Sequence, residues 1–333
     1  MDRWSLLALA RFVLASIVAV GHLYKIVGLA WIPGFEAVLA FLLISGYSIG
    51  GSYGKEPAGF LKRRVLRIYP VYVGALALVC FATPQPFSVE LAWTLVQNLL
   101  FLNQVTTQDS FIPAAWSLAL EVWLYCLTPL LWRLSPSRLR GLMYLSFVAF
   151  CCHEFSRSAF HLSYYSGVSY GMNLPLLSFA WLAGFALARE PSTSGRTIRD
   201  CALMFSSYIM LGMAIEAVHL FRHDSLASFD VTYFLADAAP LAAVLLLFKW
   251  IVAGKTGRTK SKTMRLLGDI SYPFFLVHVA TFDILIGMGI RNVPALFAAA
   301  TLMAFLFYLS LDFYSRARER KSSPGLAVPV AAD

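Results

Sequence analysis

The chain is 333 residues long, and 59% of its residues are hydrophobic while only 14% are charged. Its mean hydropathy of +0.68 excludes an ordinary soluble domain, because so apolar a surface would not stay dispersed in water. The net charge of +9 does not indicate a nucleic-acid partner, since the Lys and Arg residues lie in short clusters between apolar runs, as in membrane proteins.

Ten apolar runs predict membrane-spanning helices, for which about 20 residues each are needed. Their hydrophobicity lacks period-two alternation, so we expect an all-α, polytopic helical bundle rather than a β-barrel. The first run has a weak basic flank and no small-residue cleavage site, so we expect it to be retained as a helix. The predicted spans are 5–25, 34–52, 68–83, 115–132, 140–155, 172–188, 201–220, 230–251, 268–288 and 294–314.

One further apolar run, 89–103, is short and contains Gln97 and Asn98, so re-entry or an interfacial position stays open for it. If it does not cross, all but five of the 27 Lys and Arg residues flank the spans on the cytoplasmic side. If it were counted as a span, every later loop would change sides, and the basic cluster at 133–140 would lie outside, against that charge bias. The sequence therefore predicts one membrane domain over 1–315, a polar, disordered cytoplasmic tail over 316–333, and both termini in the cytoplasm.

The first predicted span contains Arg11 and, eleven positions later, His22. At about 100° and 1.5 Å per residue, the two share one helix face and lie about 16 Å apart along the axis. A charged Arg within hydrocarbon costs at least a few kcal/mol, which favours a cavity or a partner. Alternatively, Arg11 snorkels to the cytoplasmic interface and His22 makes a satisfied polar contact near the outer one. The two residues alone do not decide.

A basic segment, 62–70, follows the second span and carries Arg64 and Arg67. If the segment is helical, these two side chains share one face. Guanidinium groups bind phosphates bidentately, so this face suits a polyphosphate such as the phosphates of coenzyme A. The alternative is an anchor to anionic lipid headgroups that obeys the positive-inside rule.

A carboxyl group, Glu121, is expected about two turns into the span 115–132 from its outer end. An ionisable side chain inside a membrane is by default a hypothesis for a functional site. Its depth matches that of His22, which it could orient, while Glu36 at the start of the second span competes for that role. A buried carboxyl with a purely structural bond to a neighbouring helix is the alternative for Glu121.

His278 is expected near the middle of the span 268–288. A histidine at that depth needs a polar partner. Participation in a site and an ordinary interhelical hydrogen bond are both open for it.

Five short motifs occur in order over about 270 residues. Each motif is weak by itself, but together they resemble the acyltransferase 3 family of membrane O-acyltransferases. The motifs are Arg11 with His22, Ser45-Gly46-Tyr47, Arg64 to Pro70, Trp116 to Glu121, and Leu267 to His278.

The resemblance implies transfer of an acyl group, by default acetyl, from cytosolic acyl-CoA to a hydroxyl of an extracytoplasmic glycan. The acceptor would be an exopolysaccharide, an O-antigen or a lipid-linked oligosaccharide at a bacterial inner membrane, with polysaccharide biosynthesis proteins and membrane lipids as partners. No metal is expected, because the five cysteines lack CxxC spacing and neighbouring His pairs. A transporter or flippase for a lipid-linked glycan is the alternative, although no inverted repeat supports it.

The resemblance also implies roles for particular residues. His22 would be the general base or a covalent acyl carrier, with Glu121 orienting it and Arg11 lining the path of the acyl group. Arg64 and Arg67 would hold the phosphates of the donor. The remaining expected contacts are with the acceptor, and they come from Glu36, Trp116, Ser117 and His278.

Overall fold

Helices account for the secondary structure of this computed structural model, which describes residues 1–27, 32–103, 106–107, 109–160, 172–223 and 228–322. No strand occurs in these ranges, apart from an isolated bridge between Asn103 and Thr107. The elements are α1 (Arg3–Val27), α2 (Gly34–Lys55), α3 (Phe60–Ala82), α4 (Val89–Leu99), α5 (Ala115–Arg133), α6 (Pro136–Phe160), α8 (Asn173–Arg189), the 3-10 helix η1 (Pro191–Thr193), α9 (Ser194–His223), α10 (Val231–Val252), α11 (Lys262–Gly287) and α12 (Val293–Ser322). The predicted all-α polytopic fold is confirmed.

Every one of the ten predicted spans coincides with a helix, but eight of the described helices are both long and apolar enough to cross a membrane. The two others are α6, whose 25 residues include several charges, and α8, which has only 17 residues. Helix α8 is nonetheless almost entirely buried between its neighbours, with Phe179, Ala180 and Trp181 fully enclosed. The number of crossings therefore stays a prediction, whereas the number of long helices agrees with it.

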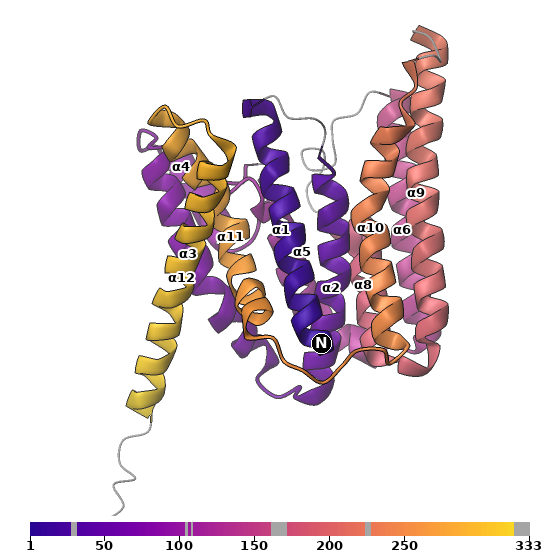
Figure 1. Cartoon of the computed structure of the whole chain (residues 1–333), viewed down its shortest axis with the longest axis horizontal. Coiled ribbons are helices and arrows are strands. Elements are labelled where there is room, and N and C mark those ends of the chain that lie inside the picture. Colours follow the sequence, from indigo (N-terminus) through magenta and orange to yellow (C-terminus); the bar gives the residue numbers. More distant parts are fainter. Residues whose placement is uncertain (28–31, 104–105, 108, 161–171, 224–227, 323–333) are drawn as a thin grey trace, which may run out of the picture.

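Successive long helices run in alternating directions through the bundle (Figure 1). The N-terminus, the connection between α10 and α11, and the last turns of α12 lie at the same end, which is the predicted cytoplasmic end. Helix α12 continues to Ser322, so the first part of the predicted disordered tail is helical. The remainder, 323–333, lies outside the described residues.

Helix α4 sits at the opposite end of the bundle (Figure 1). Its 11 residues span about 16 Å, roughly half the thickness of a bilayer core, so this helix by itself is too short to cross. Asn98 ties it to the segment before α5: its side-chain amide donates to the Asp109 carbonyl at 3.1 Å and accepts from the Phe111 amide at 3.2 Å. The Tyr72 hydroxyl of α3 donates to the Asn98 carbonyl at 3.0 Å. These bonds fix where α5 begins.

Helices α2 and α8 pack against each other through two glycines. A Cβ atom built on Gly46 would collide with the Trp181 carbonyl oxygen, and one built on Gly184 would collide with the Leu43 carbonyl oxygen. Only glycine allows backbones to approach so closely, as in small-residue contacts between other membrane helices. This contact fixes α2, which carries Ser45 and Ser48.

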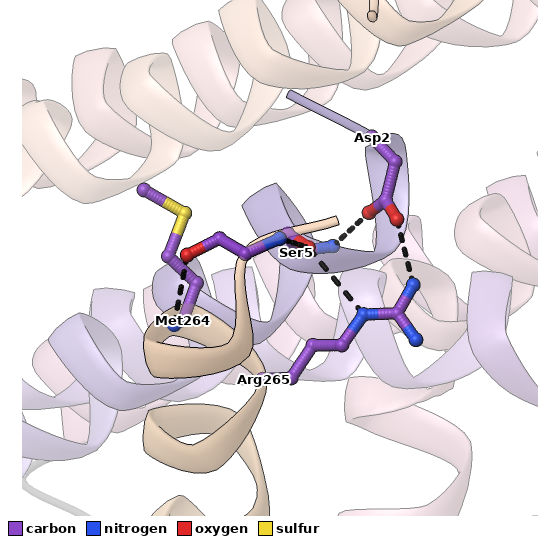
Figure 2. A network of polar contacts seen from close by, with 5 residues as sticks. Asp2, Ser5, Met264 and Arg265 are labelled. Carbon is purple, nitrogen blue, oxygen red and sulfur yellow. Dashed lines mark hydrogen bonds and ion pairs between the residues drawn. The ribbon is translucent and has the colours of Figure 1, made fainter. Parts of the chain in front are cut away.

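The N-terminal ends of α1 and α11 are joined by an ion pair (Figure 2). An Asp2 oxygen accepts from Arg265 at 2.6 Å, and the other caps α1 by accepting from the Ser5 amide at 2.6 Å. The Ser5 hydroxyl accepts in turn from the Ser261 amide at 3.1 Å. The Ser5 amide, assisted by Arg265, lowers the pKa of Asp2 to about 2. This polar clamp holds α1 and α11 in one register.

Candidate active site

One face of α1 carries the polar residues that the sequence singled out. Arg11, Ala15, Val18 and His22 follow the helical spacing of four, three and four positions, so they lie on the same side of α1. Ala15 and Val18 line an internal cavity, and Arg11 and His22 contact α2 and α11 respectively. This face therefore looks into the bundle.

Arg11 lies at the inner end of a pocket of about 220 Å³ on the predicted cytoplasmic side. Its guanidinium donates to the Ser48 hydroxyl at 2.5 Å, and Ser48 donates to the Ile44 carbonyl at 2.8 Å. Helix α11 contributes Arg265 and Asp269 to the same pocket. The Asp269 carboxyl interacts electrostatically with Arg11, although the buried Nε atom of Arg11 has no hydrogen-bond partner.

The basic segment 62–70 lies in the first turns of α3 and is therefore helical. The phosphate-binding interpretation required this. Arg64 donates to the Ser52 hydroxyl at 2.6 Å and its guanidinium lies 5.4 Å from the Phe60 ring centre. Arg67 is exposed, and its charge acts on both Arg11 and Arg64. Three arginines from α1 and α3 therefore gather on the predicted cytoplasmic side.

Glu121 is buried on the inner face of α5, with 8% of its surface exposed. Its carboxylate accepts hydrogen bonds from the side chains of Ser45 and Tyr125, and it interacts electrostatically with Arg11 and Arg64. The structure thus brings Glu121 together with the arginines and not with His22. Its charge is placed to balance theirs.

A cavity of about 20 Å³, enough for one water molecule, lies beside Glu121. Ser117 of α5 and Tyr272 and Phe275 of α11 line it, together with the α1 positions between Arg11 and His22. Trp116, the residue before Ser117, is half-buried and packs against the hydrophobic core. The cavity therefore lies against the part of α1 between Arg11 and His22, and neither histidine lines it.

His22 pairs with His278 rather than with a carboxylate. The His22 Nδ1 and His278 Nε2 atoms are 2.8 Å apart, and the rings stack with centroids 5.0 Å apart at 20°. His278 is completely buried, whereas His22 is partly exposed. The interhelical hydrogen bond that the sequence left open for His278 is therefore present.

Glu36 faces away from the histidines. It is 2% exposed, its Oε1 atom accepts from the Tyr208 hydroxyl of α9 at 2.6 Å, and the carboxyls of Glu154 and Asp237 act on it electrostatically. Glu36 thus belongs to a separate polar group between α2, α6, α9 and α10. It does not meet His22, for which it was one of the two expected partners.

Sequence reasoning missed Ser48, Asp269 and Tyr125. Sequence signals could have found two of them: Asp269 lies inside the Leu267 to His278 motif, and Tyr125 follows Glu121 by about one helical turn. Nothing in the sequence singles out Ser48. Within the described ranges, no group of three or more His, Cys, Asp or Glu side chains could hold a metal ion.

Comparison with known proteins connects this geometry to a family. The acyltransferase domain family Acyl_transf_3 matches residues 4–313. ORF330 of Acidianus two-tailed virus, named as an acetyltransferase, is 24% identical over 270 residues, 78% of this chain and 74% of that protein. Protein 2 in the picA locus of Rhizobium radiobacter is 32% identical over 151 residues, 38% of this chain and 74% of that protein. No solved structure shows a significant match. Because the family match covers nearly the whole chain, the chain belongs to the Acyl_transf_3 acyltransferases and is an integral membrane O-acyltransferase.

Proposed function

We propose that the protein transfers an acetyl group from cytosolic acetyl-CoA to a hydroxyl of an extracytoplasmic glycan, such as an exopolysaccharide or O-antigen, at a bacterial inner membrane. One observation supports this most: Arg64 and Arg11 gather around Glu121, and the α1 face that carries Arg11 continues past the cavity beside Glu121 to His22. Such an arrangement connects a donor on one side of a membrane with an acceptor on the other.

The donor would be held on the cytoplasmic side. Arg67 is exposed and Arg64 is half-buried, so both can reach the phosphates of coenzyme A. Arg11 would line the entrance to the bundle, and Glu121 would keep Arg11 and Arg64 oriented as their counter-charge. The cavity beside Glu121 has room for only one water molecule, so the acyl group enters only after side chains there move.

His22 would supply the base. The acceptor oxygen attacks the thioester carbonyl carbon while its proton passes to His22, the carbon–sulfur bond breaks, and the proton then returns to the departing thiolate of coenzyme A. A covalent variant, in which His22 first carries the acetyl group, uses the same residue. Ser117 and Trp116 are the proposed acceptor contacts, whereas Glu36 is buried in the separate polar group with Tyr208.

The test compares membranes that contain the wild type, His22→Ala or His219→Ala. His219 is an exposed histidine of α9 and serves as the matched control. With labelled acetyl-CoA, we expect wild type and His219→Ala to label the glycan fraction and His22→Ala to label none. Mass spectrometry of that fraction identifies the acceptor.

A His22→Ala protein that still acetylates would overturn the proposal. Absence of transfer by the wild type, with glycan crossing the membrane only when the wild type is present, would favour the flippase instead.

A further inference from the structure

A chain of hydrogen bonds runs through the two histidines and ends at a backbone carbonyl. His22 Nδ1 and His278 Nε2 are 2.8 Å apart, and His278 Nδ1 lies 3.1 Å from the Phe274 carbonyl oxygen. The carbonyl belongs to the preceding turn of α11, so it is fixed in place relative to His278. The far end of the chain, His22 Nε2, points away from His278.

The carbonyl determines which nitrogen of each neutral ring carries the proton. A carbonyl oxygen only accepts hydrogen bonds, so His278 must carry its proton on Nδ1. His278 Nε2 is then an acceptor, and the 2.8 Å contact requires the proton of His22 on Nδ1. His22 Nε2 is left with a free lone pair, which is the form that a general base needs.

We propose that His278 is a positioning residue that fixes His22 in the Nδ1–H tautomer and so presents its Nε2 as the base. This inference rests on the proposed function. During transfer, the acceptor proton moves to His22 Nε2, and the resulting imidazolium keeps its Nδ1–H bond to neutral His278 until it returns the proton to the thiolate. The role is the one that the sequence assigned to Glu121, which instead faces the arginines.

Packing holds His278 in this orientation. It has no exposed surface, and the rings of Phe274, Phe275 and Phe282 lie with centroids 5.9, 6.2 and 5.6 Å from its own. This apolar enclosure keeps water away from the buried hydrogen bond between His278 Nδ1 and the Phe274 carbonyl. The rotamer and the tautomer are therefore set together.

Substitutions at His278 separate positioning from packing. His278→Gln offers an amide oxygen as acceptor to His22, whereas His278→Leu fills the space without one. We expect His278→Leu to lower kcat by about 10²–10⁴-fold, the range for a misoriented catalytic histidine, with little change in KM for acetyl-CoA. His278→Gln should retain activity within about tenfold of wild type. Equal activity of the Leu variant and wild type would overturn the inference.

The tautomer itself can be measured in the unmodified protein. Nitrogen NMR of histidine-labelled wild type in lipid nanodiscs, with His22→Ala to assign the signal, should show His22 protonated on Nδ1 at neutral pH. A His22 protonated mainly on Nε2 would overturn the inference even if every His278 variant failed to fold.

The two proposals fail in different ways. Acetyl transfer by the His22→Ala variant would contradict the proposed function, and with it the role of His22 as the base. If the His22→Ala variant is inactive and the His278→Leu variant is fully active, the proposed function stands and only the positioning role of His278 is contradicted.

Discussion

The three neighbouring arginines at the start of α3 differ in what already binds them. Arg63 forms an ion pair with Glu56 at 3.0 Å and donates to the Ala58 carbonyl at 2.5 Å, so its charge is used at the surface. Arg64 has one hydrogen-bond partner, the Ser52 hydroxyl, beside its contact with the Phe60 ring, and Arg67 is exposed. A phosphate ligand would therefore bind Arg64 and Arg67 and not Arg63.

This difference predicts a KM effect confined to two positions. Arg64→Gln and Arg67→Gln should each raise KM for acetyl-CoA about tenfold or more, because a charge-assisted hydrogen bond contributes about 1.5–3 kcal/mol. Arg63→Gln should leave KM unchanged. Initial rates at varied acetyl-CoA measure all three. An equal rise for Arg63→Gln would mean that general surface charge, and not a phosphate site, attracts the donor.

The sequence identified the residues of the site better than their partners. Arg11, His22, Glu121 and His278 stand out because ionisable groups are rare in apolar helices. Depth along a helix follows from counting residues, which is why Glu121 was expected near His22. The rotation of each helix depends on packing against its neighbours, and that packing turns Glu121 toward the arginines and pairs His22 with His278. A single sequence carries no signal for that rotation.

At the level of elements, the contact between α2 and α8 positions the serines that bind Arg11 and Glu121. Gly46 is adjacent to Ser45 and two residues before Ser48 on α2. Its backbone contacts that of α8 so closely that any side chain must push the helices apart. The Ser-Gly-Tyr motif thus has two roles: its glycine allows α2 to pack closely against α8, and its serine binds Glu121.

Gly46→Ala should therefore destabilise the protein by about 1–3 kcal/mol, the usual cost of overpacking a core. It should also reduce activity by displacing Ser45 and Ser48. Gly51→Ala on the same helix is the control, because its added methyl would meet only the Trp4 ring at 3.8 Å. Thermal unfolding in detergent measures both. Unchanged stability of Gly46→Ala would mean that α2 and α8 are not in close contact.

Hydropathy located the helices but not their ends. The span predicted at 68–83 belongs to a helix that begins at Phe60, and the span predicted at 201–220 belongs to one that runs from Ser194 to His223. The physical reason is that hydropathy marks only the part of a helix in hydrocarbon, whereas the backbone continues its hydrogen bonds into the polar interface. The extension of α3 is the part that carries Arg64 and Arg67.

At the level of the whole molecule, the N-terminus binds the segment that connects α10 to α11 and the start of α11. The connection between α10 and α11 passes under the start of α1 (Figure 1), and the Asp2 amide donates to the Thr259 carbonyl at 2.9 Å. Together with the Asp2–Arg265 ion pair, this bond fixes α1 against α11. The same two helices carry His22 and His278, whose pairing needs that register. No hydropathy pattern could have predicted this clamp, because it joins residues more than 250 positions apart outside the spans.

The clamp predicts a specific dependence of stability on pH. The pKa of Asp2 is lowered from 3.8 to about 2 in the folded protein, chiefly by the Ser5 amide, then by the Ser5 hydroxyl and by Arg265. A depressed carboxyl pKa stabilises the fold fully above the unfolded pKa, and this contribution is lost as pH falls through the folded pKa. Asp2→Asn should therefore unfold at a lower temperature than wild type at pH 7, and the difference should shrink below about pH 4 and vanish near pH 2.

Asp230→Asn is the matched control for this measurement, because Asp230 also caps a helix and has a pKa lowered by the hydroxyl and amide of Thr232, but it pairs with no arginine in the described structure. Both variants keep a side-chain oxygen that can cap the helix, because Asn caps as well as Asp. Only Asp2→Asn loses a charge paired with an arginine, so only it should weaken the pairing of His22 with His278 and lower transfer activity at pH 7. A pH-independent difference in unfolding temperature for Asp2→Asn would show that its carboxylate charge does not hold α1 to α11. Equal activity of the two variants would show that the register at this end does not reach the histidines, about 30 Å along α1 from Asp2.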